Sequence, residues 1–254
     1  MSIQEVPAKP YHQHIPHDSD SGEPICTEEE TLGFFEKQIT SIHNLMRAKN
    51  QLPSFDSVRR AAEEVDGRFA AKNFSPEIPP FLQGRLPAYG ERRILAVETV
   101  LCELNYLTRE ELRQGFEQAR AEATNVPDAN DQAAEITPHP INERGENTYT
   151  PRLDQHSHCP QYQPGDLVQV LTHAQPGHIR TPVYLLGKKG RITHLQGCFL
   201  NPEDLAHFKP TVLQLPLYLV EFDMLEVWGD RCPKRSQNDK IRVEIYEPWL
   251  TALT

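Results

Sequence analysis

Apolar residues recur at helical spacing in the first part of the chain and predict two helices there. Residues 27–30 (TEEE) have the composition of a helix capping box, and apolar side chains follow at intervals of three or four residues as far as Met46. Pro53 closes this first helix. Residues 55–62 follow a serine and predict a second, shorter helix.

Two further helices are predicted after a proline-rich break. Residues 73–90 contain four prolines, which exclude a regular helix from that stretch. From Glu91 a strong amphipathic pattern continues as far as Leu107. Thr108 then begins a second capping box, which predicts a helix that ends at about Ala121.

After Pro164 the pattern changes to that of short strands. Apolar and β-branched residues alternate with polar ones there, and Gly187-Lys188-Lys189-Gly190 predicts a tight turn between two strands. Short strands at this spacing are typical of a small barrel of the SH3-like type. The expected strands are residues 167–171, 191–195, 217–222 and 242–246.

These patterns predict an α+β fold with four parts. We expect an extended N-terminal arm over residues 1–26, a helical domain over 27–121 and an SH3-like β-barrel domain over 162–254. Residues 122–161 are rich in Asn, Asp, Pro, His and Thr without periodicity. We interpret them as a long extended linker that joins the two domains.

Composition and charge argue against some classes of binding partner. The chain of 254 residues has a formal net charge of −10, which argues against nucleic acid because phosphates require a basic surface. No apolar run approaches the roughly 18–20 residues that cross a bilayer. The N-terminal sequence lacks the apolar core of a secretory signal. We therefore expect a cytoplasmic protein that binds neither nucleic acid nor membranes.

Cysteine and histidine residues do not form a recognisable metal motif. The cysteines are odd in number and widely spaced, which favours reduced thiols over a disulfide framework. Two groups are close enough in sequence to suggest metal ligands, but we favour a solvated or wrapping arm for the first and a linker for the second. The groups are His12, His14 and His17, and His156, His158 and Cys159.

Motifs of the common catalytic classes are absent from the sequence. It contains no P-loop, no glycine-rich dinucleotide motif, no nucleophile elbow and no zinc-protease motif. The chain combines a helical domain, a wrapping linker and a small barrel without such motifs. This combination indicates a subunit that wraps around another protein.

The most specific candidate site is the segment at residues 176–182 (PGHIRTP). Arg180 lies there in a turn between two apolar runs, with a proline on each side. A guanidinium is always charged and presents a planar fork of donors that suits paired oxygens. We therefore expect Arg180 to meet an anion, and we interpret His178 as a hydrogen-bonding residue of the turn.

Together with its surroundings, this segment resembles the β subunit of nitrile hydratases. The matching motifs of the C-terminal half are Gly165-Asp166, GHIRTP, Tyr184, the run at 187–190, and the closing stretches at 222–229 and 243–250. Those of the helical half are residues 35–36, 45–46, 55–59, 88–92 and 107–112. The resemblance covers roughly residues 30–115 and 162–250 and has the same order along the chain.

The resemblance implies where the chemistry takes place. In this family an α-type partner subunit holds a non-corrin Co(III) or Fe(III) ion in a C-x-x-C-S-C motif, two of whose cysteines are oxidised. This chain lacks that motif, so we expect neither metal nor other cofactor on it. By match to the family motifs, Arg59 and Arg180 are expected to pair with the oxidised cysteines, and Tyr89 to line the pocket. The complex would be a heterodimer or heterotetramer.

Three features depart from the usual nitrile hydratase pattern and leave the substrate open. Gly90 stands where a second tyrosine is common, Arg93 stands where a tryptophan is common, and the insertion around residues 70–86 is longer. Residues 15–18 and 22–23 are similar to the N-terminal arm of thiocyanate hydrolase, whose two small subunits correspond to the two halves of this chain.

Three hypotheses follow from the resemblance. In the first, the chain is the metal-free subunit of a nitrile hydratase, a hydro-lyase that converts nitriles to amides, and is not catalytic alone. In the second, it is a fusion of the small subunits of a thiocyanate hydrolase, which converts thiocyanate to carbonyl sulfide and ammonia. In the third, it is a non-catalytic assembly or metal-delivery protein.

Overall fold

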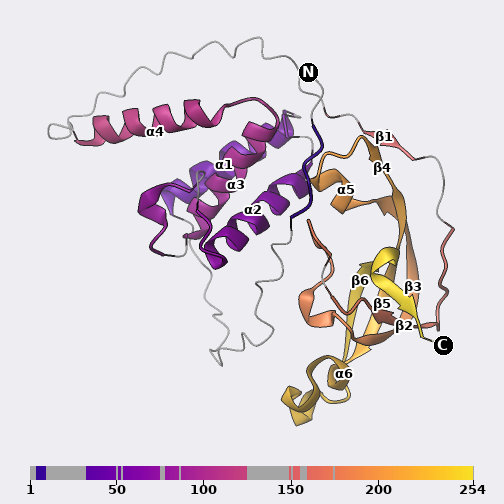
Figure 1. Ribbon diagram of the computed structural model, residues 1–254. Helices are drawn as coiled ribbons and strands as arrows, with labels where there is room; N and C mark the ends of the chain where they lie inside the picture. The colour runs from indigo at the N-terminus through magenta and orange to yellow at the C-terminus, as the bar shows by residue number, and fades with distance from the viewer. Residues whose placement is uncertain are drawn as a thin grey trace.

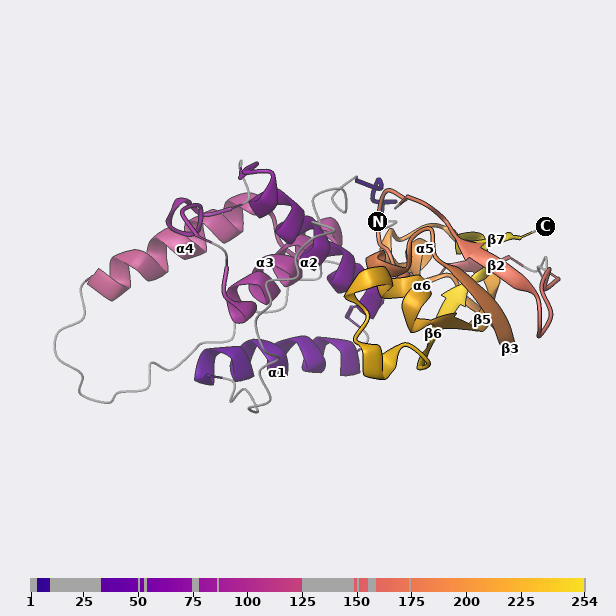
Figure 2. The ribbon, with the colours of Figure 1, turned by 90° about the horizontal axis from the view of Figure 1, so that it is seen from below.

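A group of helices forms one end of the molecule and a β-sheet forms the other in the computed structural model (Figure 1). The short segment at residues 4–9 lies between these two halves, and Figure 2 shows α1 on the opposite side of α2 and α3 from α4. The order of helices followed by an antiparallel sheet confirms the predicted α+β class. The structure describes residues 4–9, 33–49, 51–52, 54–74, 78–85, 87–124, 149, 151–154, 159–173 and 175–253.

The described part of the N-terminal half contains four α-helices. The hydroxyl oxygen of Ser54 caps α2, because it accepts a hydrogen bond from the backbone N–H of Asp56 at 3.1 Å. The prediction that the second helix is shorter is wrong: α2 has 16 residues against 15 in α1, since Val65 and Phe69 continue its buried face. The helices are α1 (Phe34–Ala48), α2 (Phe55–Ala70), α3 (Tyr89–Glu103) and α4 (Arg109–Thr124), with a single turn, η2 (Pro80–Leu82), in the proline-rich break.

An antiparallel sheet of five strands forms the C-terminal half, in the order β6-β5-β3-β2-β7. Tyr218, Val220 and Phe222 alternate along β5 and face the core, as expected for a sheet with one buried face. No ladder among the described residues joins β6 to β7, so the SH3-like barrel stays a prediction. The strands are β2 (Leu167–Val170), β3 (Lys189–Leu200), β5 (Gln214–Asp223), β6 (Lys240–Tyr246) and β7 (Leu250–Ala252).

One detail of the predicted C-terminal half is wrong, and one strand was not predicted. The run at residues 187–190 does not join two strands, because it leads from a short helix, η3 (Val183–Leu185), into β3. The predicted linker contains a strand, β1 (Arg152–Leu153), which pairs in parallel with β4 (Thr211–Val212). Two residues are too few to show alternation, so the sequence pattern could not reveal this strand. The remaining short helices are α5 (Pro202–Ala206), α6 (Met224–Trp228), η4 (Gly229–Arg231), η5 (Lys234–Ser236) and η6 (Glu247–Trp249).

One group of buried apolar residues joins the two halves. It packs Val58 of α2 and Val97 of α3 against Val6 of the N-terminal segment and against Phe208, which follows α5. Phe208 is 1% exposed, so the C-terminal half supplies a core residue to the helical half. Separate groups of buried residues fill the sheet and the far end of α2.

A buried arginine on α2 links the N-terminal segment, α3 and α5. The Arg60 side chain is 1% exposed, and its Nε donates to the carbonyl oxygen of Ala206 at 2.9 Å. Its terminal nitrogens bind Glu64 at 2.8 Å and both carboxylate oxygens of Glu103. The Nζ of Lys9 donates to Glu64 at 2.8 Å. A charge buried this deeply is stable only while its partners are present.

We expect Arg60→Met to lower the free energy of unfolding by about 3–5 kcal/mol, because it removes the cation that two largely buried carboxylates, Glu64 and Glu103, share. Urea unfolding followed by circular dichroism measures this change. Arg113→Met on α4 is the matched control, since Arg113 also pairs with two carboxylates, Glu110 and Glu117, but is about half exposed. We expect no measurable change there, and equal effects of the two substitutions would contradict the role of burial.

His207 ties the N-terminal segment to the turn at residues 176–182. Its Nδ1–H donates to the carbonyl oxygen of Val6 at 2.9 Å, and its Nε2 accepts from the backbone N–H of His178 at 3.2 Å. This arrangement requires the neutral imidazole, which has one donor and one acceptor. Burial, reinforced by the charge of Arg60, lowers the pKa of His207 to about 4.

The lowered pKa predicts that His207 makes stability depend on pH. The contribution of the neutral ring is complete above the ordinary pKa of about 6.5 and is lost as the pH falls toward 4. His207→Gln does not titrate, so we expect the difference in unfolding free energy between wild type and variant to shrink by about 2 kcal/mol from pH 7 to pH 4. His194→Gln, at an exposed position of β3, is the control. A difference that stays constant with pH would contradict this assignment.

Candidate functional site

The shape of the turn at residues 176–182 is set by Gly177. Its φ of +96° is a conformation that residues with a side chain rarely adopt. A Cβ at this position would lie 2.6 Å from Nε2 of His207 and 3.1 Å from Cβ of Ala8. The turn is therefore held closely against the N-terminal segment and α5, and its next residues face α2.

The side chain of His178 joins this turn to α2. It is 1% exposed, and its Nδ1 lies 3.0 Å from Oε1 of Glu63. Its Nε2 lies 3.6 Å from Oδ1 of Asp56, which is within ion-pair distance but longer than a hydrogen bond. Burial disfavours the charged ring, but the two carboxylates outweigh burial and raise the pKa of His178. His178 thus forms the expected hydrogen bond, to α2 rather than within its own turn.

Arg59 and Arg180 lie near each other, and Asp56 is close to both. The Nη1 of Arg59 lies 3.9 Å from Oδ1 of Asp56. Burial opposes ionisation of Asp56, but His178, Arg180 and Arg59 together lower its pKa. Burial and the charge of Arg180 also lower the pKa of Arg59. The Arg59 side chain is 42% exposed and Arg180 is exposed, so both guanidiniums are accessible to a partner.

Phe55, the first residue of α2, supports the side chain of Arg59. The guanidinium carbons of Arg59 and Arg47 lie 4.4 Å and 4.8 Å from the centre of the Phe55 ring, within the range of cation–π contacts. The ring of His43 stacks on Phe55 with centres 5.5 Å apart. Burial and the charges of Arg93 and Arg47 lower the pKa of His43 to about 4. His43 is therefore a neutral ring among three cations.

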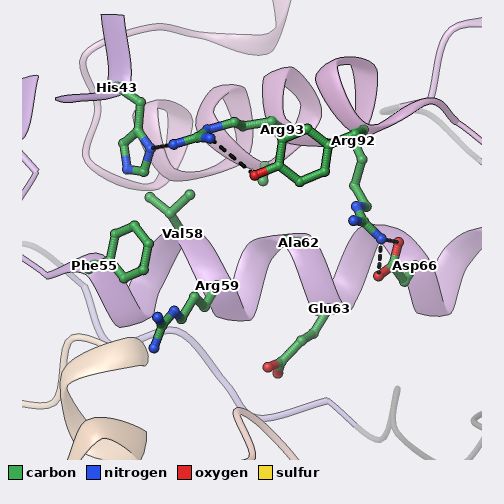
Figure 3. Close-up of a pocket in the computed structure, with 11 residues that line it drawn as sticks. His43, Phe55, Val58, Arg59, Ala62, Glu63, Asp66, Arg92 and Arg93 are labelled. Carbon is green, nitrogen blue, oxygen red and sulfur yellow. Dashed lines mark hydrogen bonds and ion pairs between the residues drawn. The ribbon is translucent and has the colours of Figure 1, made fainter. Parts of the chain in front are cut away.

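A pocket of about 400 Å³ opens between α2 and α3. Figure 3 shows Arg59 on its α2 side, Arg93 on its α3 side and His43 of α1 at one end. Tyr89 also lines the pocket, is 49% exposed, and its hydroxyl accepts a hydrogen bond from Nη1 of Arg93 at 3.2 Å. Arg59 and Tyr89 thus border the same pocket, and Arg180 lies near Arg59 but is not among the lining residues.

Two neighbouring arginines of this pocket, Arg92 and Arg93, differ in the charge of their partners among the described residues. Arg92 forms an ion pair with Asp66 at 3.2 Å. Arg93 has no carboxylate partner within the described part of the chain, and its hydrogen bonds go to three neutral groups. These are the hydroxyls of Thr40 and Tyr89, each at 3.2 Å, and Nδ1 of His43 at 2.8 Å. The pocket therefore carries a cation that an anionic ligand would stabilise.

Sequence reasoning named Arg59, Arg180 and Tyr89 as candidate site residues but missed the carboxylates that lie beside Arg59 and His178. Asp56 and Glu63 lie three residues before and four residues after Arg59, a spacing that places all three on one helix face. That spacing could have indicated from the sequence alone that both carboxylates lie near Arg59. The contact of His178 with Glu63 spans 115 residues, and no local pattern could reveal it.

The described residues contain neither a metal-binding cluster nor a membrane-crossing helix. Among the described residues, no group of three His, Cys, Asp or Glu side chains is arranged to hold a metal ion. The histidines of the arm, His156 and His158 lie outside the described residues, and Cys159 is exposed. No described helix combines the length and apolar character that crossing a membrane requires.

The C-terminal half matches a known family. Residues 151–252 match the family model described as nitrile hydratase beta subunit, C-terminal. The nitrile hydratase subunit beta of Pseudomonas chlororaphis is 29% identical over 198 residues, which cover 78% of this chain and 72% of that protein. This alignment is too long to fit within the C-terminal half, so it also takes in part of the helical half.

Two further nitrile hydratase β subunits and one solved structure are similar to this chain over shorter lengths. The nitrile hydratase subunit beta of Rhodococcus sp is 30% identical over 37% of this chain and 39% of its own length. The cobalt-containing nitrile hydratase subunit beta of Pseudonocardia thermophila is 28% identical over 36% of this chain and 37% of its own length. A recombinant apo-enzyme structure of thiocyanate hydrolase from Thiobacillus thioparus matches 37% of this chain and 76% of its own, at 25% identity and a TM-score of 0.34. Residues 151–252 are thus similar to the C-terminal domain of nitrile hydratase β subunits, and the alignment with the Pseudomonas chlororaphis subunit extends this similarity into the helical half.

Proposed function

We propose that this chain is the metal-free subunit of a nitrile hydratase and completes an active site whose metal belongs to an α-type partner. A Co(III) or Fe(III) ion in the C-x-x-C-S-C motif of that partner would supply Lewis acidity toward the nitrile. The proposal rests on the family match and on the surface that α2 and the turn at 176–182 form together. The complex would be a heterodimer or heterotetramer, with the sheet as an SH3-like barrel.

The observation that carries this proposal is the proximity of Arg59 and Arg180. Two accessible guanidiniums near each other repel. Burial and this repulsion lower the pKa of Arg59, although Asp56 and Glu63 oppose the change. Anionic oxygens from a partner would relieve this repulsion through charge-assisted hydrogen bonds. Oxidised cysteines of the α-type subunit present such oxygens at the subunit boundary. The role of this chain would be to fix the geometry around the partner's metal rather than to bind it.

Tyr89 would act from the opposite side of the pocket. Its hydroxyl already accepts a hydrogen bond from Arg93, which leaves its own proton free to be donated to a substrate. Half of the side chain is exposed, so a nitrile that enters the pocket can reach it. We therefore assign Tyr89 to orientation of the substrate rather than to proton abstraction.

The test is to express the chain with a C-x-x-C-S-C subunit and to assay the purified complex on acetonitrile, benzonitrile and thiocyanate. We expect Arg59→Lys and Arg180→Lys to lower kcat by about 10–100-fold, because lysine keeps the charge but loses the planar fork. Size-exclusion chromatography should show an intact complex. Arg242→Lys is the control, since Arg242 is an exposed arginine of β6 that pairs with Glu221 at 2.8 Å.

Two outcomes would contradict the proposal. Near-normal turnover in both lysine variants would remove the role of the two arginines. Failure to form a stoichiometric complex that contains cobalt or iron would favour the alternative of a transient assembly or metal-delivery protein.

Hydrolysis of thiocyanate is a second candidate function, and Arg93 favours it. Thiocyanate is an anion, whereas simple nitriles are neutral. Arg93 is a cation of the pocket whose partners among the described residues are all neutral. An anionic substrate would compensate this charge, and a neutral nitrile would not.

We expect Arg93→Met to lower kcat/KM for thiocyanate by about tenfold, which corresponds to ~1.4 kcal/mol, and to change the value for acetonitrile little. Arg92→Met is the matched control in the same pocket, because Asp66 already compensates the charge of Arg92. Steady-state assays of the complex measure both constants. Equal losses for the two substrates would contradict electrostatic selection by Arg93.

A further inference from the structure

His178 is placed to control the position of Arg180, which follows it by two residues. The backbone of the turn is fixed by the close approach of Gly177 to His207, and the side chain of His178 is fixed by α2. We propose that His178 is a positioning residue, which clamps the turn onto Asp56 and Glu63 and so holds Arg180 near Arg59. This inference rests on the proposed function, since it assumes that the two arginines act at the active site.

The geometry of the clamp calls for the imidazolium form of His178. Nδ1 lies 3.0 Å and 3.2 Å from the two carboxylate oxygens of Glu63, and Nε2 lies 3.6 Å from Oδ1 of Asp56. A neutral ring has only one N–H, so its second nitrogen would direct a lone pair at a carboxylate. The charged ring has a donor for each carboxylate. Because the ring is 1% exposed, water cannot replace either partner.

The charge of His178 also affects how strongly Asp56 attracts Arg59 and Arg180. While His178 is charged, it shares the negative charge of Asp56, and Arg59 stays 3.9 Å from that carboxylate. With a neutral His178, Asp56 and Glu63 would lose one of the cations that compensate their charge in a half-buried position. They would draw Arg59 and Arg180 toward α2 and away from the surface that faces a partner. The two arginines would then lose their shared orientation.

Two other titratable side chains, Glu203 and His207, lie near His178. Glu203 of α5 interacts with His178 electrostatically, and burial raises the pKa of Glu203. His207 is close to His178 as well, but its neutral ring only accepts from the His178 backbone. Asp56 and Glu63 are therefore the groups that hold the proton of His178 in place. The contribution of the imidazolium is complete below the ordinary histidine pKa and is lost as the pH rises through the raised pKa.

The experiment compares the wild-type complex with His178→Gln and Glu63→Gln over a range of pH. The wild type should lose kcat on the alkaline side as His178 deprotonates. His178→Gln should lower kcat by about tenfold with little change in KM, and should remove that alkaline loss. Glu63→Gln should move the alkaline loss to lower pH, because the ring then has one carboxylate fewer. A purely structural role would not shift the pH profile.

The controls separate this inference from the proposed function. His194→Gln, at an exposed position of β3, should leave the profile unchanged. The ring of His178 can also be titrated directly by NMR in the wild-type complex, with assignment from His178→Gln, and should hold its proton above pH 6.5. A ring that deprotonates at or below that pH, or unchanged kcat and pH profile in His178→Gln, would overturn the clamp. A wild-type complex that converts neither nitriles nor thiocyanate would instead overturn the proposed function, while the titration still tests the clamp.

Discussion

The arrangement of the two halves depends on the buried guanidinium of Arg60. It lies on α2, yet its hydrogen bonds reach α3 through Glu103 and α5 through the carbonyl oxygen of Ala206. Because an unpaired buried charge is so unfavourable, the two halves have little freedom to separate while this side chain is ionised. Phe208 adds an apolar contact across the same junction. The same junction keeps the turn that carries Arg180 close to α2, where His178 also contacts Glu63.

Two faces of α2 have different surroundings, one at the pocket and one in the core. Arg59 and Arg60 are neighbours in sequence, but one side chain is 42% exposed and the other 1%. A rotation of about 100° per residue is sufficient to place one at the pocket and the other in the core. Glu63 and Glu64 follow four residues later and divide in the same way, toward His178 and toward Arg60. Each arginine face thus has its own carboxylate one turn away.

Three buried histidines show how neighbouring charge selects a protonation state. His43 lies beside arginines and His207 near Arg60, and both rings stay neutral because burial and the cations lower their pKa. His178 is equally buried but faces two carboxylates, which raise its pKa. Burial alone would have made all three neutral. The choice is made by side chains from other segments of the chain, and this is why the histidines could not be distinguished in the sequence.

The amino-acid pattern was sufficient to predict the main helices and most strands of the larger sheet. Helical spacing located α1 to α4, and strand alternation located most of the five-stranded sheet, because these signals are local. The family resemblance named Arg59, Arg180 and Tyr89, and the structure brings Arg59 into the same pocket as Tyr89 and near Arg180. The charge environment of these residues became visible only in the folded chain. Arg93 lacks a carboxylate among the described residues, and His178 has two from another half of the chain, because such contacts depend on packing between distant segments rather than on local pattern.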